Sequence, residues 1–237
     1  MTKNNYRAGL KTGLPVGIGY FSVSFGFGAM AAAQGIRALD AALISVTNLT
    51  SAGQFAGLTL ILASAGLWEM VLTQLVINSR YALMSLALSQ RMGKEIGILQ
   101  RMLIAYINTD EIFALAMAEK NPLTTSFMMG LGTLPMIGWT FGTLFGALAG
   151  SVLPVSIRTA LGVMLYGMFV AIVIPPARKE QPVFYTMMLA LVFSCLFTWL
   201  PGLKHVSAGI SIVICTVAAA AICAWRFPIA EEEEAAV

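Results

Sequence analysis

Charged residues are scarce in this sequence. Of its 237 residues only 11% are Asp, Glu, Lys or Arg, whereas 58% are apolar and the mean hydropathy is +0.83. A soluble domain carries about a quarter charged residues, so the composition excludes an ordinary soluble protein. Apolar runs of about twenty residues recur along the whole chain, which predicts an all-α, polytopic membrane protein.

Histidine and cysteine are also few. His205 is the only histidine, and all three cysteines, Cys195, Cys215 and Cys223, fall in apolar segments. Their spacing fits neither a metal site nor a nucleophile with its base, so we expect the cysteines to be packing residues. The sequence therefore disfavours an intramembrane enzyme and indicates no metal ion, cofactor or nucleic-acid partner.

Hydropathy predicts six to eight membrane segments joined by short connections. No connection is long enough to separate a soluble domain, so we expect one transmembrane domain over residues 1–230. Residues 231–237 at the end, four of which are glutamates, form an acidic tail that is most simply solvated. The candidate segments cover residues 14–34, 39–66, 68–88, 99–119, 130–150, 156–176, 183–200 and 206–225.

Lysine and arginine indicate how the chain is oriented. If every segment crossed the membrane from an inside N-terminus, Arg91, Lys94 and Arg101 would lie outside, against the positive-inside rule. Segment 39–66 is the best candidate for failing to cross, because the polar run TNLTSAGQ interrupts it, and backbone leaves a helix at membrane depth only where protein or water satisfies it. We expect two half-helices that meet near 51–53 and re-enter; a broken helix that crosses is the alternative.

An internal repeat predicts a second break. Residues 14–30 and 134–150 align without a gap at an offset of 120 and share six identical positions. The repeat makes 156–176 the counterpart of 39–66, with Gly167 near its middle.

Two re-entrant segments would leave three crossings before residue 130. The halves 1–120 and 121–230 would then form an inverted repeat, a common transporter architecture, with both termini in the cytoplasm. Glycines at every fourth position, such as Gly9, Gly13 and Gly17, predict faces where helices pack closely; the second such run is Gly138, Gly142, Gly146 and Gly150.

Two adjacent carboxylates interrupt another apolar segment. In INTDEIFALAM, Asp110 and Glu111 follow Asn108 and Thr109 in the middle of a run of membrane length. Helical geometry places these side chains all round the axis, so the segment is either surrounded by protein and water or unwound. Ionisable residues within spans usually mark a pathway or a proton relay, so we expect a functional site. The alternative is a shallow helix with its carboxylates in headgroup water.

The preceding segment offers a partner for these carboxylates. Arg80 is the one cation well inside a span, and it either pairs with Asp110 or Glu111 or snorkels to the inner surface. A polar stripe on the same helix is expected to face a cavity, whereas Arg80 points roughly the other way. The stripe consists of Gln74, Asn78, Tyr81 and Ser85.

Three short motifs carry a family resemblance. SAGQFA (51–56), NSRYALMS (78–85) and NTDEIFA (108–114), in this order and spacing, resemble the AzlC-type large subunit of bacterial branched-chain amino acid exporters, the AzlC/AzlD permease family. The resemblance covers nearly the whole chain. It implies a multi-pass permease of the bacterial inner membrane that exports branched-chain amino acids such as valine together with a small hydrophobic AzlD-type subunit.

The same residues suit a small zwitterion with an apolar side chain. A half-helix beginning after Gly53 would direct the N–H groups of Gln54 and Phe55 at a carboxylate, and Phe55 would hold the branched side chain. The predicted substrate site comprises Ser51, Gly53, Gln54, Phe55, Asn78 and Tyr81.

The buried charges complete the predicted site. Asp110 or Glu111 would receive the ammonium group or a coupling proton, and we expect the two to differ in role, with Asp110 favoured as the titrating group. A proton-coupled secondary transporter is therefore the predicted function. A channel or pore for a small solute or ion is the alternative, although pores tend to arrange rings of like groups by oligomerisation.

Overall fold

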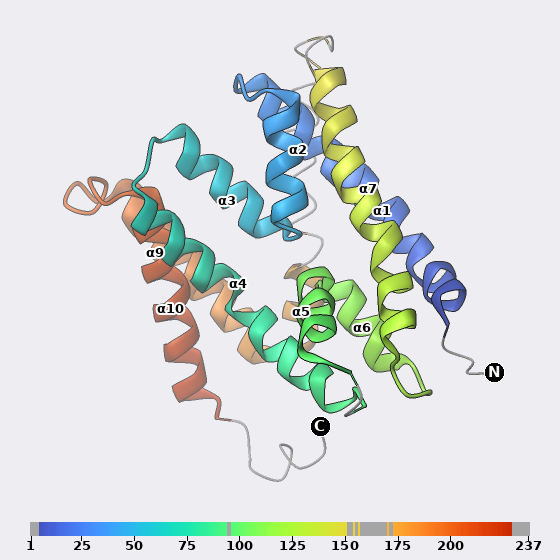
Figure 1. Cartoon of the computed structure of the whole chain (residues 1–237). Coiled ribbons are helices and arrows are strands. Elements are labelled where there is room, and N and C mark those ends of the chain that lie inside the picture. Colours follow the sequence, from blue (N-terminus) through green and yellow to red (C-terminus); the bar gives the residue numbers. More distant parts are fainter. Residues whose placement is uncertain are drawn as a thin grey trace. The chain divides into compact units, whose positions relative to one another are not determined.

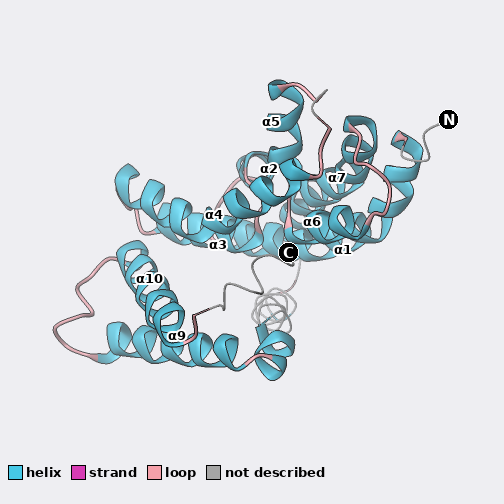
Figure 2. Cartoon of the chain, turned by 90° about the horizontal axis from the view of Figure 1, so that it is seen from below, coloured by secondary structure: helices cyan, strands magenta, loops and turns pink. Residues whose placement is uncertain are grey.

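A computed structural model describes residues 5–93, 96–150, 154, 156, 170 and 173–228. Helices joined by loops make up this part of the chain, and no strand is drawn in it (Figures 1 and 2). The helices are α1 (Tyr6–Ala33), α2 (Ala38–Thr47), α3 (Ser51–Leu62), α4 (Leu67–Gln90), α5 (Ile98–Ile107), α6 (Asp110–Ala118), α7 (Thr125–Gly150), α9 (Gln181–Trp199) and α10 (Ala208–Arg226).

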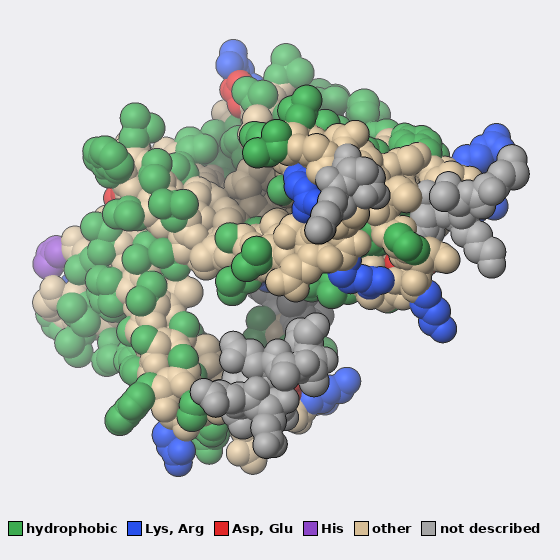
Figure 3. All heavy atoms as spheres, turned by 60° about the horizontal axis from the view of Figure 1, so that its bottom comes forward, with side chains coloured by type: hydrophobic (Ala, Val, Ile, Leu, Met, Phe, Trp, Pro, Cys, Tyr) green, Lys and Arg blue, Asp and Glu red, His purple; other side chains and the backbone are tan. Residues whose placement is uncertain are grey.

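Five of the described helices, α1, α4, α7, α9 and α10, are long and apolar enough to cross a membrane. Hydrophobic side chains also cover much of the visible surface (Figure 3). Trp68, Trp199 and Trp225 are among the most exposed hydrophobic residues, and each lies near the end of a long helix. The ends of membrane-spanning helices lie at the membrane–water interfaces, where tryptophan is enriched. The prediction of an all-α, polytopic membrane protein is confirmed.

The chain divides into two compact units. The first contains residues 1–58 and 78–165, and the second contains 59–77 and 166–237, so α3 and α4 each contribute to both. In the second unit, the Glu69 carboxylate near the start of α4 accepts a hydrogen bond of 2.8 Å from the N–H of Gly209. The first turns of α4 and α10 are therefore joined.

In the first unit, α1 and α7 pack through their glycines. A Cβ atom at Gly9 would meet the backbone of Phe127, and one at Gly146 would meet the backbone of Phe25. The prediction that these glycine faces pack against other helices is confirmed. Because early residues of α1 meet early residues of α7 and late residues meet late ones, the two helices run parallel.

Helices α2 and α3 form a hairpin whose turn is the predicted break. Ser45, before the break, donates a hydrogen bond of 3.0 Å to Gln54, after it, so the first turn of α3 comes back alongside α2. Residues Asn48–Thr50 are not helical, which confirms the predicted break. The break lies slightly before the expected position at 51–53, because α3 already begins at Ser51. Whether this hairpin re-enters or crosses stays a prediction.

Helices α5 and α6 form a second hairpin, fastened at its open end by two arginines. Arg101, in the first turn of α5, donates to the carbonyls of Ser89 and Gly93 behind it, at 3.2 and 3.1 Å. Arg91, just after α4, donates to the carbonyls of Met117 and Glu119 at the end of α6, at 2.6 and 2.7 Å. The chain therefore enters and leaves this hairpin at one end of the unit.

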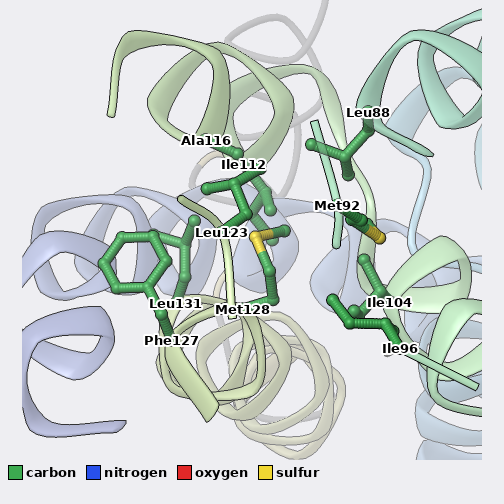
Figure 4. Packing of buried hydrophobic residues seen from close by; sticks show 10 residues of the cluster. All are labelled: Leu88, Met92, Ile96, Ile104, Ile112, Ala116, Leu123, Phe127, Met128 and Leu131. Atoms are coloured by element: carbon green, nitrogen blue, oxygen red, sulfur yellow. The ribbon is translucent and has the colours of Figure 1, made fainter. Parts of the chain in front are cut away.

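A buried apolar cluster holds this second hairpin against α7 (Figure 4). Ile104 of α5, Ile112 of α6 and Met128 of α7 are among its fully buried members. The cluster consists of Leu88, Met92, Ile96, Ile104, Ile112, Ala116, Leu123, Phe127, Met128 and Leu131.

The second hairpin corrects two predictions. The segment 99–119 is unwound at Asn108 and Thr109, which was one of the two alternatives, but the chain turns back there, so the segment is not one crossing helix. The chain therefore reaches α7 at the end where α1 begins, and the two helices are parallel instead of antiparallel. The inverted repeat of 1–120 with 121–230 is thus wrong for this pair of helices. Most of 156–176, including Gly167, lies outside the described residues, as do Lys94 and the acidic tail 231–237.

Candidate functional site

The two hairpin turns meet inside the first unit. The hydroxyl of Tyr106, in the last turn of α5, donates a hydrogen bond to the carbonyl of Val46, in the last turn of α2. α2 starts next to the C-terminal end of α1, whereas α5 starts near the end where α1 and α7 begin. The hairpins therefore approach from opposite ends, and their unwound turns lie together.

Tyr20 marks the depth of this meeting point. It lies half-way along the 28 residues of α1, about 21 Å from the start of the helix at about 1.5 Å per residue. Its hydroxyl lies 2.7 Å from the Thr109 hydroxyl and donates a hydrogen bond to the Glu111 carboxylate. Trp139 of α7 packs edge-on against the Tyr20 ring, with centroids 5.2 Å apart. The second break is thereby fixed against the middle of α1.

Asp110 takes a different partner from Glu111. One carboxylate oxygen of Asp110 lies 2.8 Å from a guanidinium nitrogen of Arg80, and both side chains are about half exposed. The guanidinium also donates to the Tyr81 hydroxyl at 3.1 Å and lies over the Tyr81 ring, 4.9 Å from its centroid. Of the alternatives for Arg80, the structure therefore contains the pair with Asp110. The expectation that Arg80 points away from Tyr81 is wrong, because its long side chain folds over the ring.

The polar stripe of α4 reaches the second break through Ser85. The Asn108 amide donates to the Ser85 hydroxyl at 3.3 Å. The other amide atom, Asn108 Oδ1, is buried without a hydrogen-bond partner in the part of the chain that is described. Gln74 and Asn78 are half-buried on the same helix, and Gln74 falls in the second unit. The structure thus connects Ser85 and Tyr81 of the stripe to the carboxylates.

The first break presents a buried polar group of its own. Ser45 donates a hydrogen bond to Gln54 Oε1, and its oxygen therefore accepts the hydrogen bond of 2.6 Å from the Thr143 hydroxyl of α7. Gln54 is fully buried, and its Nε2 donor has no partner among the described residues. An orphaned buried donor of this kind is costly unless a water or a ligand satisfies it.

The free N–H groups at this break differ from those expected. Because α3 begins at Ser51, the N–H of Gln54 donates within the helix to the carbonyl of Thr50, at 2.9 Å, and is not available to a substrate. Gly53 N–H is 3.4 Å from the Thr50 hydroxyl. The expectation for Gln54 N–H is therefore wrong, and the open end of α3 is its first turn, at Ser51.

Phe55 is also placed differently from the expectation. Its ring packs edge-on against Phe27 of α1 at 5.0 Å, and only 9% of the residue is exposed. Phe55 is thus part of the packing between α3 and α1, next to the site and not at its centre.

The two hairpins differ in charge at their turns. Both α3 and α6 point their N-termini, where the helix dipole is positive, into the site. The first turn of α6 carries Asp110 and Glu111, which offset that charge, whereas the first turn of α3 carries no acidic residue. An anion is therefore favoured near Ser51 and a cation near the carboxylates.

Sequence reasoning missed the contribution of α1 and of the aromatic hydroxyls. Tyr20 and Trp139 lie in the long apolar helices α1 and α7, and Tyr106 lies just before the polar residues Asn108 and Thr109, but nothing beside any of the three identifies its partner. Only position offered a signal, since Tyr20 stands at the middle of a membrane-length helix. Their partners are distant in sequence, so no local pattern could identify the contacts.

Comparisons with known proteins agree with this architecture. The model of the AzlC protein family matches residues 15–153, more than half of the chain. "Inner membrane protein YgaZ" of Escherichia coli (strain K12) is 29% identical over 184 residues, which cover 74% of this chain and 75% of that protein.

A similar protein is also found in an archaeon. An uncharacterized membrane protein of Archaeoglobus fulgidus is 28% identical over 178 residues, which cover 74% of this chain and 78% of that protein. No solved structure matches. The family match spans α1 to α7, including both hairpins and the carboxylates, and the chain therefore belongs to the AzlC family of membrane proteins.

Proposed function

We propose that this protein is a secondary transporter that exports branched-chain amino acids across the bacterial inner membrane, coupled to protons. Membership of the AzlC family supports the reaction class, and the name of the E. coli relative supports the membrane. The observation that carries the proposal is the meeting of two unwound hairpin turns, one bearing two carboxylates, half-way along α1. Discontinuous helices at mid-depth are where secondary transporters bind their substrates.

The charge pattern of the turns suits an amino acid. The substrate carboxylate would lie at the open first turn of α3, where the orphaned Nε2 of Gln54 adds a donor. The ammonium group would lie toward Asp110 and Glu111 at the other hairpin. A zwitterion would therefore connect the two hairpins, with each charge at the turn of opposite sign.

Positive residues support a cytoplasmic N-terminus. Arg7, Lys11, Arg91 and Arg101 lie at the end of the first unit where α1 and α7 begin, whereas Arg37 lies at the other end, after α1. The positive-inside rule places the first of these ends in the cytoplasm. The C-terminus is proposed to be cytoplasmic as well.

A small AzlD-type membrane subunit is proposed as the partner, on family membership alone. The glycines of α7 at 138–150 give this proposal no support, because α1 already fills that face.

Efflux measurements test the function. Cells loaded with radiolabelled valine are compared with and without this chain, each with the candidate small subunit present. Saturable efflux that stops when a protonophore collapses the gradient is expected, and little activity is expected from the chain alone. Efflux that grows linearly with concentration and ignores the proton gradient would instead indicate a pore.

A further inference from the structure

We propose that Glu111, positioned by Tyr20, carries the coupling proton, and that Asp110 is held as a fixed charge by Arg80. This assignment rests on the proposed function and gives the two neighbouring carboxylates separate tasks. It also reverses the preference for Asp110 that the sequence suggested.

Asp110 is poorly suited to gaining and losing a proton. Its carboxylate is paired with the Arg80 guanidinium at 2.8 Å, and Arg80 is itself held on Tyr81. Protonating Asp110 would leave the arginine charge without its counter-charge at membrane depth, where unpaired charges are costly. Asp110 therefore stays ionised while Arg80 stays in place.

Glu111 has a neutral partner instead. Its carboxylate accepts a hydrogen bond from the Tyr20 hydroxyl, and in the described part of the chain it forms no ion pair. A tyrosine hydroxyl can donate or accept. The carboxylate can thus accept from Tyr20, and the carboxylic acid, once a proton has bonded to one of its oxygens, can donate to the Tyr20 oxygen. Neither state leaves an unpaired cation.

The surroundings of Glu111 favour reversible proton uptake. Among the described residues, the ionisable groups linked to the two carboxylates are Tyr20 of α1, which donates to Glu111, and Arg80 of α4, which pairs with Asp110 and contacts Tyr81. The charges of Arg80 and Asp110 cancel each other. The net charge of the three residues therefore changes only when Glu111 takes up or releases a proton. Glu111 is also exposed and lies beside the middle of α1, so protein atoms do not enclose its carboxylate.

The test uses purified protein in proteoliposomes with the candidate small subunit. Proton movement on addition of valine is followed with a pH-sensitive dye, and the apparent KM is measured as a function of pH. The wild type is expected to move protons and to show a pH-dependent KM. Glu111→Gln is expected to lose both, whereas Glu119→Gln, the same exchange in the loop before α7, where the carboxylate accepts hydrogen bonds from Asn121, is expected to keep both.

Two further variants keep the result decisive if Glu111→Gln is inactive. Tyr20→Phe retains both carboxylates but removes the Tyr20 hydrogen bond, which is stronger to the ionised carboxylate than to the carboxylic acid because the acceptor is then charged. The pH midpoint of transport should therefore move upward, by about one unit for a hydrogen bond to a charged group. The double variant R80Q/D110N should keep the pH dependence of the wild-type KM, even if its transport rate differs.

Two outcomes overturn the assignment: proton movement that persists in Glu111→Gln, or an unchanged midpoint in Tyr20→Phe. A wild-type protein that moves no amino acid in any condition would refute the proposed function itself, which is a separate result.

Discussion

The parallel packing of α1 and α7 predicts opposite effects for the same substitution at two glycines of α1. Gly28 is buried against α7, and a Cβ there would lie 2.7 Å from the backbone nitrogen of Ala147. Ordinary van der Waals contact begins at 3.4 Å, and the carbonyl oxygen of Thr143 lies closer still to such a Cβ, so the helices would have to separate by more than about 0.7 Å. Gly19, nine residues earlier, has nothing within 4 Å of such a Cβ.

Alanine at either position gains helix propensity, worth up to about 1 kcal/mol. Gly19→Ala should therefore leave the protein as stable or slightly more stable. At Gly28 the atoms in the way are backbone, which cannot rotate aside, so overpacking should cost about 1–3 kcal/mol relative to the control. Because both variants share the propensity gain, the difference between them isolates the cost of close packing.

The free energy of unfolding can be measured in mixed micelles by titrating with SDS and following helicity by circular dichroism. Gly146→Ala, which meets the backbone of Phe25, should behave like Gly28→Ala. Equal stability of Gly28→Ala and Gly19→Ala would refute the close approach of α1 and α7.

Three further predictions concern the second hairpin. In a cysteine-free background, single cysteines at Gly97 and Asn121 should be accessible to an impermeant thiol reagent from the same side of the membrane; labelling from opposite sides would mean that 98–118 crosses after all. Asp110→Asn should lower the amount of protein in the membrane by leaving Arg80 unpaired, and R80Q/D110N should recover most of it; equal loss in both variants would show that the pair does not matter for folding. Tyr106→Phe removes the hydrogen bond to Val46 and should lower the transport rate more than the abundance, which immunoblotting alongside efflux would separate.

The interruptions of the helices could be predicted from the sequence, but the direction of the chain beyond them could not. Asn48 and Asn108, with the polar residues that follow, disfavour continuous helix in an apolar run, and both runs do break there. Whether the chain then continues or turns back depends on contacts outside the segment. At the second break those contacts come from Arg91 and Arg101, which bond to backbone carbonyls and therefore have no recognisable partner in the sequence.

In the candidate site, too, some residues could be found from the sequence and others could not. Asp110 and Glu111 could be singled out because carboxylates are rare in apolar segments, but their roles depend on which neighbour each one meets. Arg80 was recognisable as a cation in a span, whereas Tyr20 was one aromatic residue among many in α1. Residues with unusual chemistry for their surroundings could be found from the sequence, and ordinary residues in decisive positions could not.

The hydrogen bond between Tyr106 and Val46 has a consequence for how thick the barriers around the site are. The two residues are the ends of two ten-residue arms, α2 and α5, each about 15 Å long at about 1.5 Å per residue. The hydrocarbon core of a bilayer is about 30 Å thick, so each arm reaches about half-way. If both hairpins re-enter and a solute binds at the turns, as proposed, a single short hairpin would separate that solute from each side. Displacing one hairpin would then open a path to one side while the other hairpin still closed the opposite side.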